Sequence, residues 1–288
     1  MMGTPDGTVR WFGSVLCSGL IFAAVLLSAG CLGASSDGAG ADGSPGGTPG
    51  VDGSPGGAPG VDSSPGAGYS DPGSVSGSGR PAGRKLTLSG VDTLVVAGNF
   101  IVHVKIGEPE QVTMGMDHDL PDLVDATVTG SQLHLGLRPG ASVWGAPPTA
   151  DVTVRHLGRL TVSGATKAVL DSTVTGKTLH LEAYGVSQIT GPVRADAAVV
   201  SATGASRLVL SGNVGRLNLQ GMGTCDLQLS DLSIQDLDAD VTGASQAVVT
   251  VRGTLAAEAN GASTLRYSGN PRITRQETTG VALITAVQ

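Results

Sequence analysis

The stretch TGAS at residues 203–206 returns as TGAS at 242–245, and the variants SGAT, YGVS and NGAS begin at residues 163, 184 and 260. Comparable glycines recur along the chain, and the steps from each to the next are 21, 19, 17, 22, 18 and 19. The set comprises Gly164, Gly185, Gly204, Gly221, Gly243, Gly261 and Gly280. Near-regular spacing of about 19 residues is typical of a solenoid, in which each repeat forms one coil that stacks on the next.

The segments between these glycines alternate apolar and polar residues with a period of two. RLVLSG at 207–212, GRLNLQG at 215–221 and QAVVTVRG at 246–253 are rich in Val, Leu and Thr and end in turn-forming residues, which predicts strands. No segment has the pattern of a long amphipathic helix. We therefore predict an all-β fold, a right-handed parallel β-helix-like solenoid of about 19-residue coils with a more irregular N-terminal β section.

The repeated phrase has a structural interpretation. Glycine can take the positive φ that a sharp corner requires, and the residue after it, such as Ala205 or Ala244, is small or apolar and is expected to point into the core. The residue two positions after the glycine is usually Ser or Thr, and hydroxyls stacked from coil to coil can form hydrogen bonds along the solenoid. The alternative is that these hydroxyls line a ligand-binding surface.

Residues 1–30 resemble an export signal. The apolar run VLCSGLIFAAVLLSAG at 15–30 follows Arg10 and ends at Cys31, and it is shorter than the ~20 residues of a membrane-spanning helix. LLSAGC resembles a bacterial lipobox, which predicts lipidation of Cys31. An ordinary cleaved signal peptide and a retained membrane helix are the alternatives.

Residues 31–84 are predicted to be a disordered tether that begins with the lipidated cysteine. Residues 32–84 hold 17 Gly and 7 Pro and almost no large apolar side chain, so they cannot form a core. The folded head is predicted to span residues 85–288. It contains one cysteine, Cys225, which cannot form an intramolecular disulfide and is expected to be a small buried residue.

The folded part resembles the head GIN domain family of bacterial adhesin heads. The resemblance rests on FIVHVKIGEPEQVTM at 100–114, DLVDATVTGSQLHLGL at 122–137, the train of TGAS-like phrases and YSGNPRI at 267–273, in that order, and it covers about residues 92–285. It implies a β-helix-like head on an exported, often lipid-anchored protein. The family supplies no catalytic residues to assign here.

Composition and motifs narrow the function. The net charge of −7, without a basic stripe, argues against nucleic acid as a partner. The sequence contains no G-x-S-x-G, H-E-x-x-H, P-loop or C-x-x-C motif. Asp236, Asp238 and Asp240 share one face of a strand by their period of two and are candidate Ca²⁺ ligands; a solvated polar face is the alternative interpretation.

The sequence thus predicts a lipid-anchored head of the cell envelope that binds a surface glycan or protein without catalysis or a required cofactor. The alternative is a carbohydrate-active β-helix enzyme, a lyase or hydrolase that uses Ca²⁺. Leu32 follows the lipidated cysteine where Asp would mark inner-membrane retention, which favours the outer membrane.

Overall fold

The computed structural model describes residues 74–76, 81–117, 123–138, 141–144 and 146–287. The predicted signal at 1–30, Cys31 and the tether up to residue 73 lie outside the described residues. The described residues form strands and no helix, so none of them makes a helix that could cross a membrane. The prediction of an all-β solenoid is confirmed, with about 7 turns at roughly 19-residue spacing.

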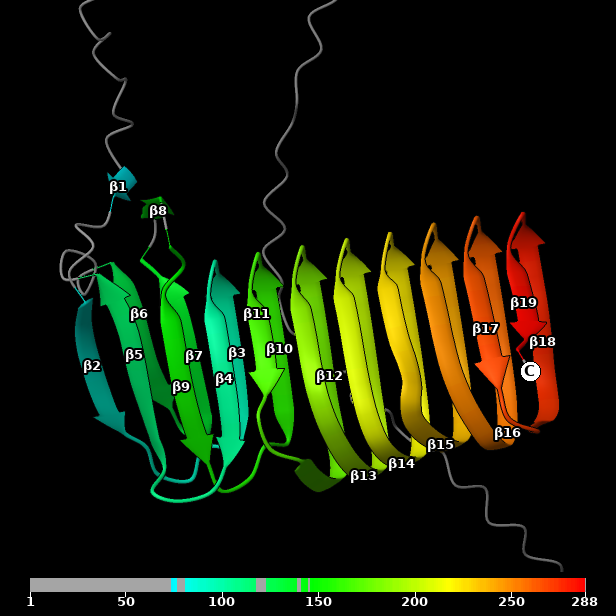
Figure 1. Cartoon of the computed structure of the whole chain (residues 1–288), viewed down its shortest axis with the longest axis horizontal. Coiled ribbons are helices and arrows are strands. Elements are labelled where there is room, and N and C mark those ends of the chain that lie inside the picture. The colour runs from blue at the N-terminus through cyan, green and yellow to red at the C-terminus, as the bar shows by residue number, and fades with distance from the viewer. Residues whose placement is uncertain (1–73, 77–80, 118–122, 139–140, 145, 288) are drawn as a thin grey trace, which may run out of the picture. The chain divides into compact units, whose positions relative to one another are not determined.

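The solenoid is built from ten strands that pair only in parallel, each with its counterpart in the next coil (Figure 1). They are β10 (Arg159–Gly164), β11 (Lys167–Leu170), β12 (Val174–Gly185), β13 (Gln188–Gly204), β14 (Arg207–Gly223), β15 (Asp226–Gly243), β16 (Gln246–Gly261), β17 (Thr264–Ser268), β18 (Arg272–Gly280) and β19 (Leu283–Ala286).

Each coil contributes to two parallel faces, which we call the first and the second. The first face contains the stretches that run into a corner glycine, and the second face contains those that leave it. Inward side chains stack in register between coils; one such row on the first face is Leu181, Val200, Leu219, Ala239 and Ala257. All five are at most 1% exposed, so alternation with period two places one continuous apolar core between the faces.

The N-terminal section is more irregular, as the sequence predicts. Its strands are β2 (Pro81–Thr87), β3 (Thr93–Gly98), β4 (Ile101–Ile106), β5 (Gln111–Asp117), β6 (Val124–Thr129), β7 (Gln132–Leu137) and β9 (Thr149–Val154). β3 and β4 continue the two faces by pairing in parallel with β10 and β11, whereas β2–β5, β5–β9 and β6–β7 are antiparallel. The described fold begins ahead of the predicted boundary at residue 85. Separately, β1 (Ser74–Ser76) pairs with β8 (Ser142–Trp144).

Candidate functional site

The glycine corners form a continuous stack along the solenoid. Their φ angles lie between 79° and 112°, the left-handed region that glycine tolerates without strain. The stacked residues are Gly164, Gly185, Gly204, Gly223, Gly243, Gly261 and Gly280. The prediction was wrong at Gly221, which lies buried in register with Val241, and Gly223 makes that corner. With Gly223 in place, the steps between successive corners become 21, 19, 19, 20, 18 and 19.

The corner is oriented opposite to our expectation. The residue after each glycine, for example Ala205 or Ala244, is exposed, and the residue after that one is buried, except at Gly280, where Ala282 is half-buried. Ser206 is 1% exposed and Ser245 0%. Because the glycine reverses the chain direction through a positive φ, the period-two alternation restarts with the hydroxyl residue inside.

The buried hydroxyls satisfy backbone carbonyls of the corners. Ser206 Oγ donates to the Thr203 carbonyl at 3.0 Å and lies 3.3 Å from the Gly185 carbonyl of the preceding coil. Ser187 and Ser245 make the equivalent contacts, each with the carbonyl three residues before it and with the corner glycine carbonyl of the preceding coil. A buried hydroxyl with both neighbours inside the protein cannot line a ligand surface, so the repeated phrase is an architectural element.

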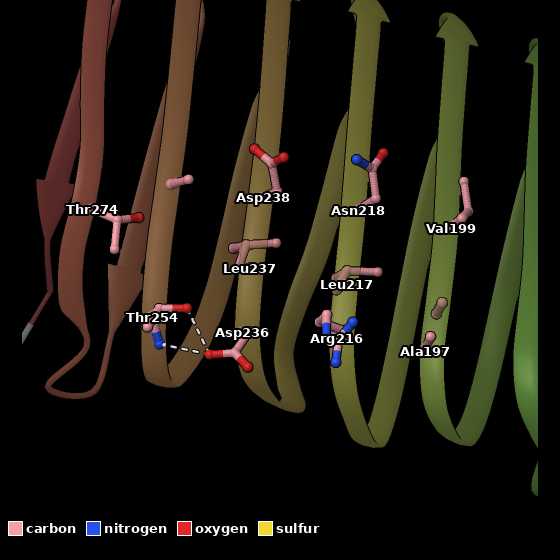
Figure 2. Close-up of a pocket in the computed structure, with 12 residues that line it drawn as sticks. Ala197, Val199, Arg216, Leu217, Asn218, Asp236, Leu237, Asp238, Thr254 and Thr274 are labelled. Carbon is pink, nitrogen blue, oxygen red and sulfur yellow. Dashed lines mark hydrogen bonds between the residues drawn. The ribbon is translucent and has the colours of Figure 1, made fainter. Parts of the chain in front are cut away.

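A groove of about 390 Å³ lies on the first face and crosses five coils, on β13, β14, β15, β16 and β18 (Figure 2). Polar side chains from four strands line it: Arg216 and Asn218 from β14, Asp236 and Asp238 from β15, Thr254 from β16 and Thr274 from β18. Asn218 and Asp238 stand side by side in register, and so do Arg216 and Asp236. The small side chains of Ala197 from β13 and Ala256 from β16 leave the groove open to solvent.

Two of the three predicted aspartates reach this groove. Asp236 accepts hydrogen bonds from the backbone N–H of Thr254 at 3.2 Å and from its hydroxyl at 2.6 Å. Asp238 accepts a hydrogen bond from Arg275 at 3.0 Å. Asp240 accepts one from Thr242 at 3.0 Å and lies outside the groove lining.

All three aspartates therefore already have partners within the protein. Across the described residues there is no group of three or more His, Cys, Asp or Glu side chains arranged to hold a metal ion. Binding of Ca²⁺ at these aspartates stays a prediction for a titration to test.

The first face continues toward the N-terminus as a charged and aromatic surface. Arg159 forms an ion pair with Glu182, and Glu182 also accepts a hydrogen bond from Thr161 at 3.1 Å. Tyr184, 40% exposed, lies on the same face, one strand before β13. Partial burial, followed by the neighbouring negative charge of Glu182, raises the pKa of the Tyr184 phenol.

Sequence reasoning identified Asp236 and Asp238 but missed Arg216, Asn218 and Thr254. These residues lie one coil away in sequence and become neighbours only through the strand register. Once coils are aligned on the corner glycines, residues 20 or 18 positions from an aspartate are its lateral neighbours, and that alignment is the signal that could have found them.

Comparison with known proteins gives a family match over most of the folded part. The family model described as "Putative auto-transporter adhesin, head GIN domain" matches residues 90–271. Among curated proteins, no relative matches in sequence.

Several solved structures share the fold. A "putative adhesin" from Bacteroides fragilis superimposes with a TM-score of 0.69 at 15% identity, covering 74% of this chain and 100% of its own. A "putative lipid binding protein" from Parabacteroides distasonis has a TM-score of 0.65 at 15% identity over 75% and 100% of the two chains. A "putative adhesin" from Parabacteroides merdae has a TM-score of 0.63 at 16% identity over 75% and 99%. At these identities the likeness establishes the fold alone.

Proposed function

The chain belongs to the head GIN domain family of adhesin heads, and from this premise we propose that it is a non-catalytic, surface-binding head of the bacterial cell envelope. The sequence supports an extracytoplasmic location, with an anchor at Cys31 and a Gly/Pro-rich tether between anchor and head. Lipid attachment in the outer membrane is part of the proposal.

The observation that carries the proposal is the polar first face. Outward side chains from successive coils stand in register at the ~4.8 Å spacing of β-strands. One outward row is polar in four successive coils and consists of Ser201, Gln220, Asp240 and Glu258. Arg216, Asn218 and Thr254 offer donors and acceptors within one open groove, and Tyr184 adds an exposed aromatic ring on the same face. An extended chain of hydroxyl-rich units matches such a surface.

We therefore propose an envelope polysaccharide as the ligand class and the first-face groove as its site. The groove is open, and its two carboxylates accept hydrogen bonds from Thr254 and Arg275. Both features fit reversible binding by contact. A surface protein is the other partner that the sequence allows, and a binding screen separates the two.

The test is a screen of the full chain, purified in detergent, against envelope polysaccharides, with Arg216→Ala as the site variant. Arg266→Ala is the matched control, because it removes the same charge from an exposed position on the second face. Loss of a hydrogen bond from a charged group should weaken binding about tenfold in Arg216→Ala and leave Arg266→Ala unchanged. Equal affinities for the two variants would contradict the assignment of the site.

The enzyme alternative is tested on the same sample. Each polysaccharide is incubated with the protein, with and without Ca²⁺, and new chain ends are measured. Cleavage that Asp236→Asn or Asp238→Asn lowers by 10²-fold or more would replace the binding proposal, since removal of a general acid or base has an effect of that size.

A further inference from the structure

The C-terminal end of the solenoid presents open strand edges. β18 pairs with β16 and β19 pairs with β17, and in the described part of the chain neither strand has a partner on its other edge (Figure 1). All nine residues of β18 are exposed. An open edge carries a row of unpaired backbone N–H and C=O groups that can pair with another strand.

Apolar side chains gather at this same end. Eight large hydrophobic residues are exposed among those described, and four of them belong to the last coil. They are Ile273 (40%), Val281 (81%), Leu283 (52%) and Val287 (40%). Exposed apolar groups concentrated beside an unpaired edge mark a contact surface.

The sequence of β18 is self-complementary around Gln276. If β18 pairs antiparallel with β18 of a second copy and Gln276 lies on the two-fold axis, Arg275 stands opposite Glu277 of the second copy, and Glu277 stands opposite its Arg275. Opposite charges in directly paired positions stabilise a sheet. Arg275 already approaches Asp238 at 3.0 Å and Glu258 at 3.9 Å, which holds its guanidinium on this face.

The second face gives an independent match to the same axis. The side-chain N–H of Gln276 donates to the Ile284 carbonyl at 3.4 Å, so these two residues lie opposite each other across the core. A two-fold axis through Gln276 therefore passes at Ile284. That register places Val281 opposite Val287 of the second copy, and both side chains are exposed in the single head. The same two-fold axis thus pairs opposite charges on the first face and apolar side chains beside the second face.

We propose that two heads join tail to tail, with β18 pairing antiparallel to β18 and β19 to β19 of a second copy. In the described fold, β2 of the N-terminal section lies at the opposite end from β18 and β19, so the chains that lead to the two proposed anchors leave a tail-to-tail pair at opposite ends. This geometry joins copies on two apposed surfaces. That last step rests on the proposed surface role, whereas the pairing itself does not.

The first experiment measures self-association of the full chain in detergent by sedimentation equilibrium. Glu277→Arg should weaken the dimer at least tenfold, because it places like charges opposite each other twice per dimer. The double change Arg275→Glu with Glu277→Arg should restore association. Asp231→Arg, an exposed position in the middle of the solenoid, is the control with the same change in charge. A monomeric wild-type chain at 100 µM, or equal effects of Glu277→Arg and Asp231→Arg, would overturn the proposal.

A second experiment is independent of charge. In the proposed register the two Gln276 Cα atoms lie about 5 Å apart, within disulfide range, so Gln276→Cys should form a cross-linked dimer on mild oxidation. Arg272→Cys is the control, because its symmetry mate lies about 26 Å away at 3.3 Å per residue. The wild-type chain, oxidised in the same way, shows how much cross-linking its native cysteines cause. Equal cross-linking of the two variants would contradict the register.

Vesicles that carry the anchored full chain test the apposed arrangement. Wild-type vesicles should aggregate and Glu277→Arg vesicles should not, while Arg216→Ala vesicles should lose polysaccharide binding and still aggregate. This pattern separates the two proposals, since each variant affects one activity. A chain that dimerises in detergent but never aggregates vesicles would overturn the apposed arrangement.

Discussion

The solenoid and the N-terminal section reach the same two-faced architecture by different means. From β12 to β18 every pairing between successive coils is parallel and joins residues 17 to 20 positions apart. In the N-terminal section three pairings are antiparallel, and β3 and β4 pair with strands far along the chain, as when Thr93 stands opposite Arg159. A repeat thus specifies its fold locally, whereas the N-terminal section depends on contacts between distant segments. Changes at equivalent positions of the two regions test this difference.

The largest expected effect is at a corner glycine of the solenoid. A Cβ on Gly243, whose φ is 94°, would lie 2.4 Å from the Gly223 carbonyl oxygen of the preceding coil. Backbone cannot move away within a stack, so Gly243→Ala should lower the free energy of unfolding by about 3 kcal/mol or more. Thermal and urea denaturation measure it.

The matched variant in the N-terminal section is Gly98→Ala. Gly98 also has a positive φ of 122°, but a Cβ there would meet only side-chain atoms, Phe100 at 3.5 Å and Leu137 at 3.6 Å. The cost should be limited to the backbone strain of about 1–2 kcal/mol. A loss at Gly98 as large as that at Gly243 would show that stacking of backbones is not what the corners require.

The difference between the regions also explains what the sequence predicts. The coil length, the all-β class and six of the seven corners follow from local repetition, because one glycine per coil must take a positive φ. Gly221 was mistaken for a corner because QGMG offers two glycines two residues apart. Period-two alternation places both on the same side of a strand, and only the register with Gly204 and Gly243 distinguishes Gly223.

Side-chain size does not show which of the two residues after a corner glycine points into the core. Alanine and serine are similar in volume, so both fit inside, and what decides is the need of buried carbonyls for a donor. The groove was missed for a further reason. β15 has register shifts between Leu229 and Ser233 and between Ile234 and Asp236 relative to β16, so lateral neighbours cannot be assigned from a constant coil length.

The next effect in size contrasts two adjacent corner residues. Ser206→Ala removes the hydroxyl that donates to the Thr203 carbonyl and lies near the Gly185 carbonyl, which should lower the free energy of unfolding by about 1–2 kcal/mol. Ala205→Asp places a charge on an exposed position and should change it by less than about 0.5 kcal/mol. Urea midpoints compare them directly; a larger effect of the aspartate would reverse the orientation of the corner.

A pH-dependent effect at acid pH is expected in the N-terminal section. Glu110 is 7% exposed and accepts backbone N–H bonds from Gly90 at 2.9 Å and Arg155 at 3.2 Å. These bonds lower the pKa of the Glu110 carboxyl below its ordinary value of 4.5. A lowered folded-state pKa contributes stability above the unfolded pKa, and this stability is lost as the pH falls through the folded pKa.

Glu110→Gln should therefore destabilise the chain at neutral pH and flatten the loss of stability below about pH 4.5. Hydrogen exchange should show the change in β2, β5 and β9, while β13–β16 keep their protection. Asp196→Asn, an exposed carboxylate of the solenoid, is the control. An unchanged acid limb in Glu110→Gln would mean that these backbone bonds do not hold the section together.

A small effect is expected at the one corner of the solenoid where a thiol replaces the hydroxyl. Cys225 is buried at the position of Ser206 and Ser245, and its Sγ lies 3.4 Å from the Met222 carbonyl and 3.7 Å from that of Gly204. A hydroxyl is the stronger donor, so Cys225→Ser should gain a better hydrogen bond, partly offset by the smaller apolar volume. We expect a net stabilisation of about 0.5 kcal/mol. Cys225→Ala lacks any donor and should lose about 1 kcal/mol, and denaturation midpoints in reducing buffer compare the three chains. If serine proved as costly as alanine, volume rather than hydrogen bonding would decide which residue fits a solenoid corner.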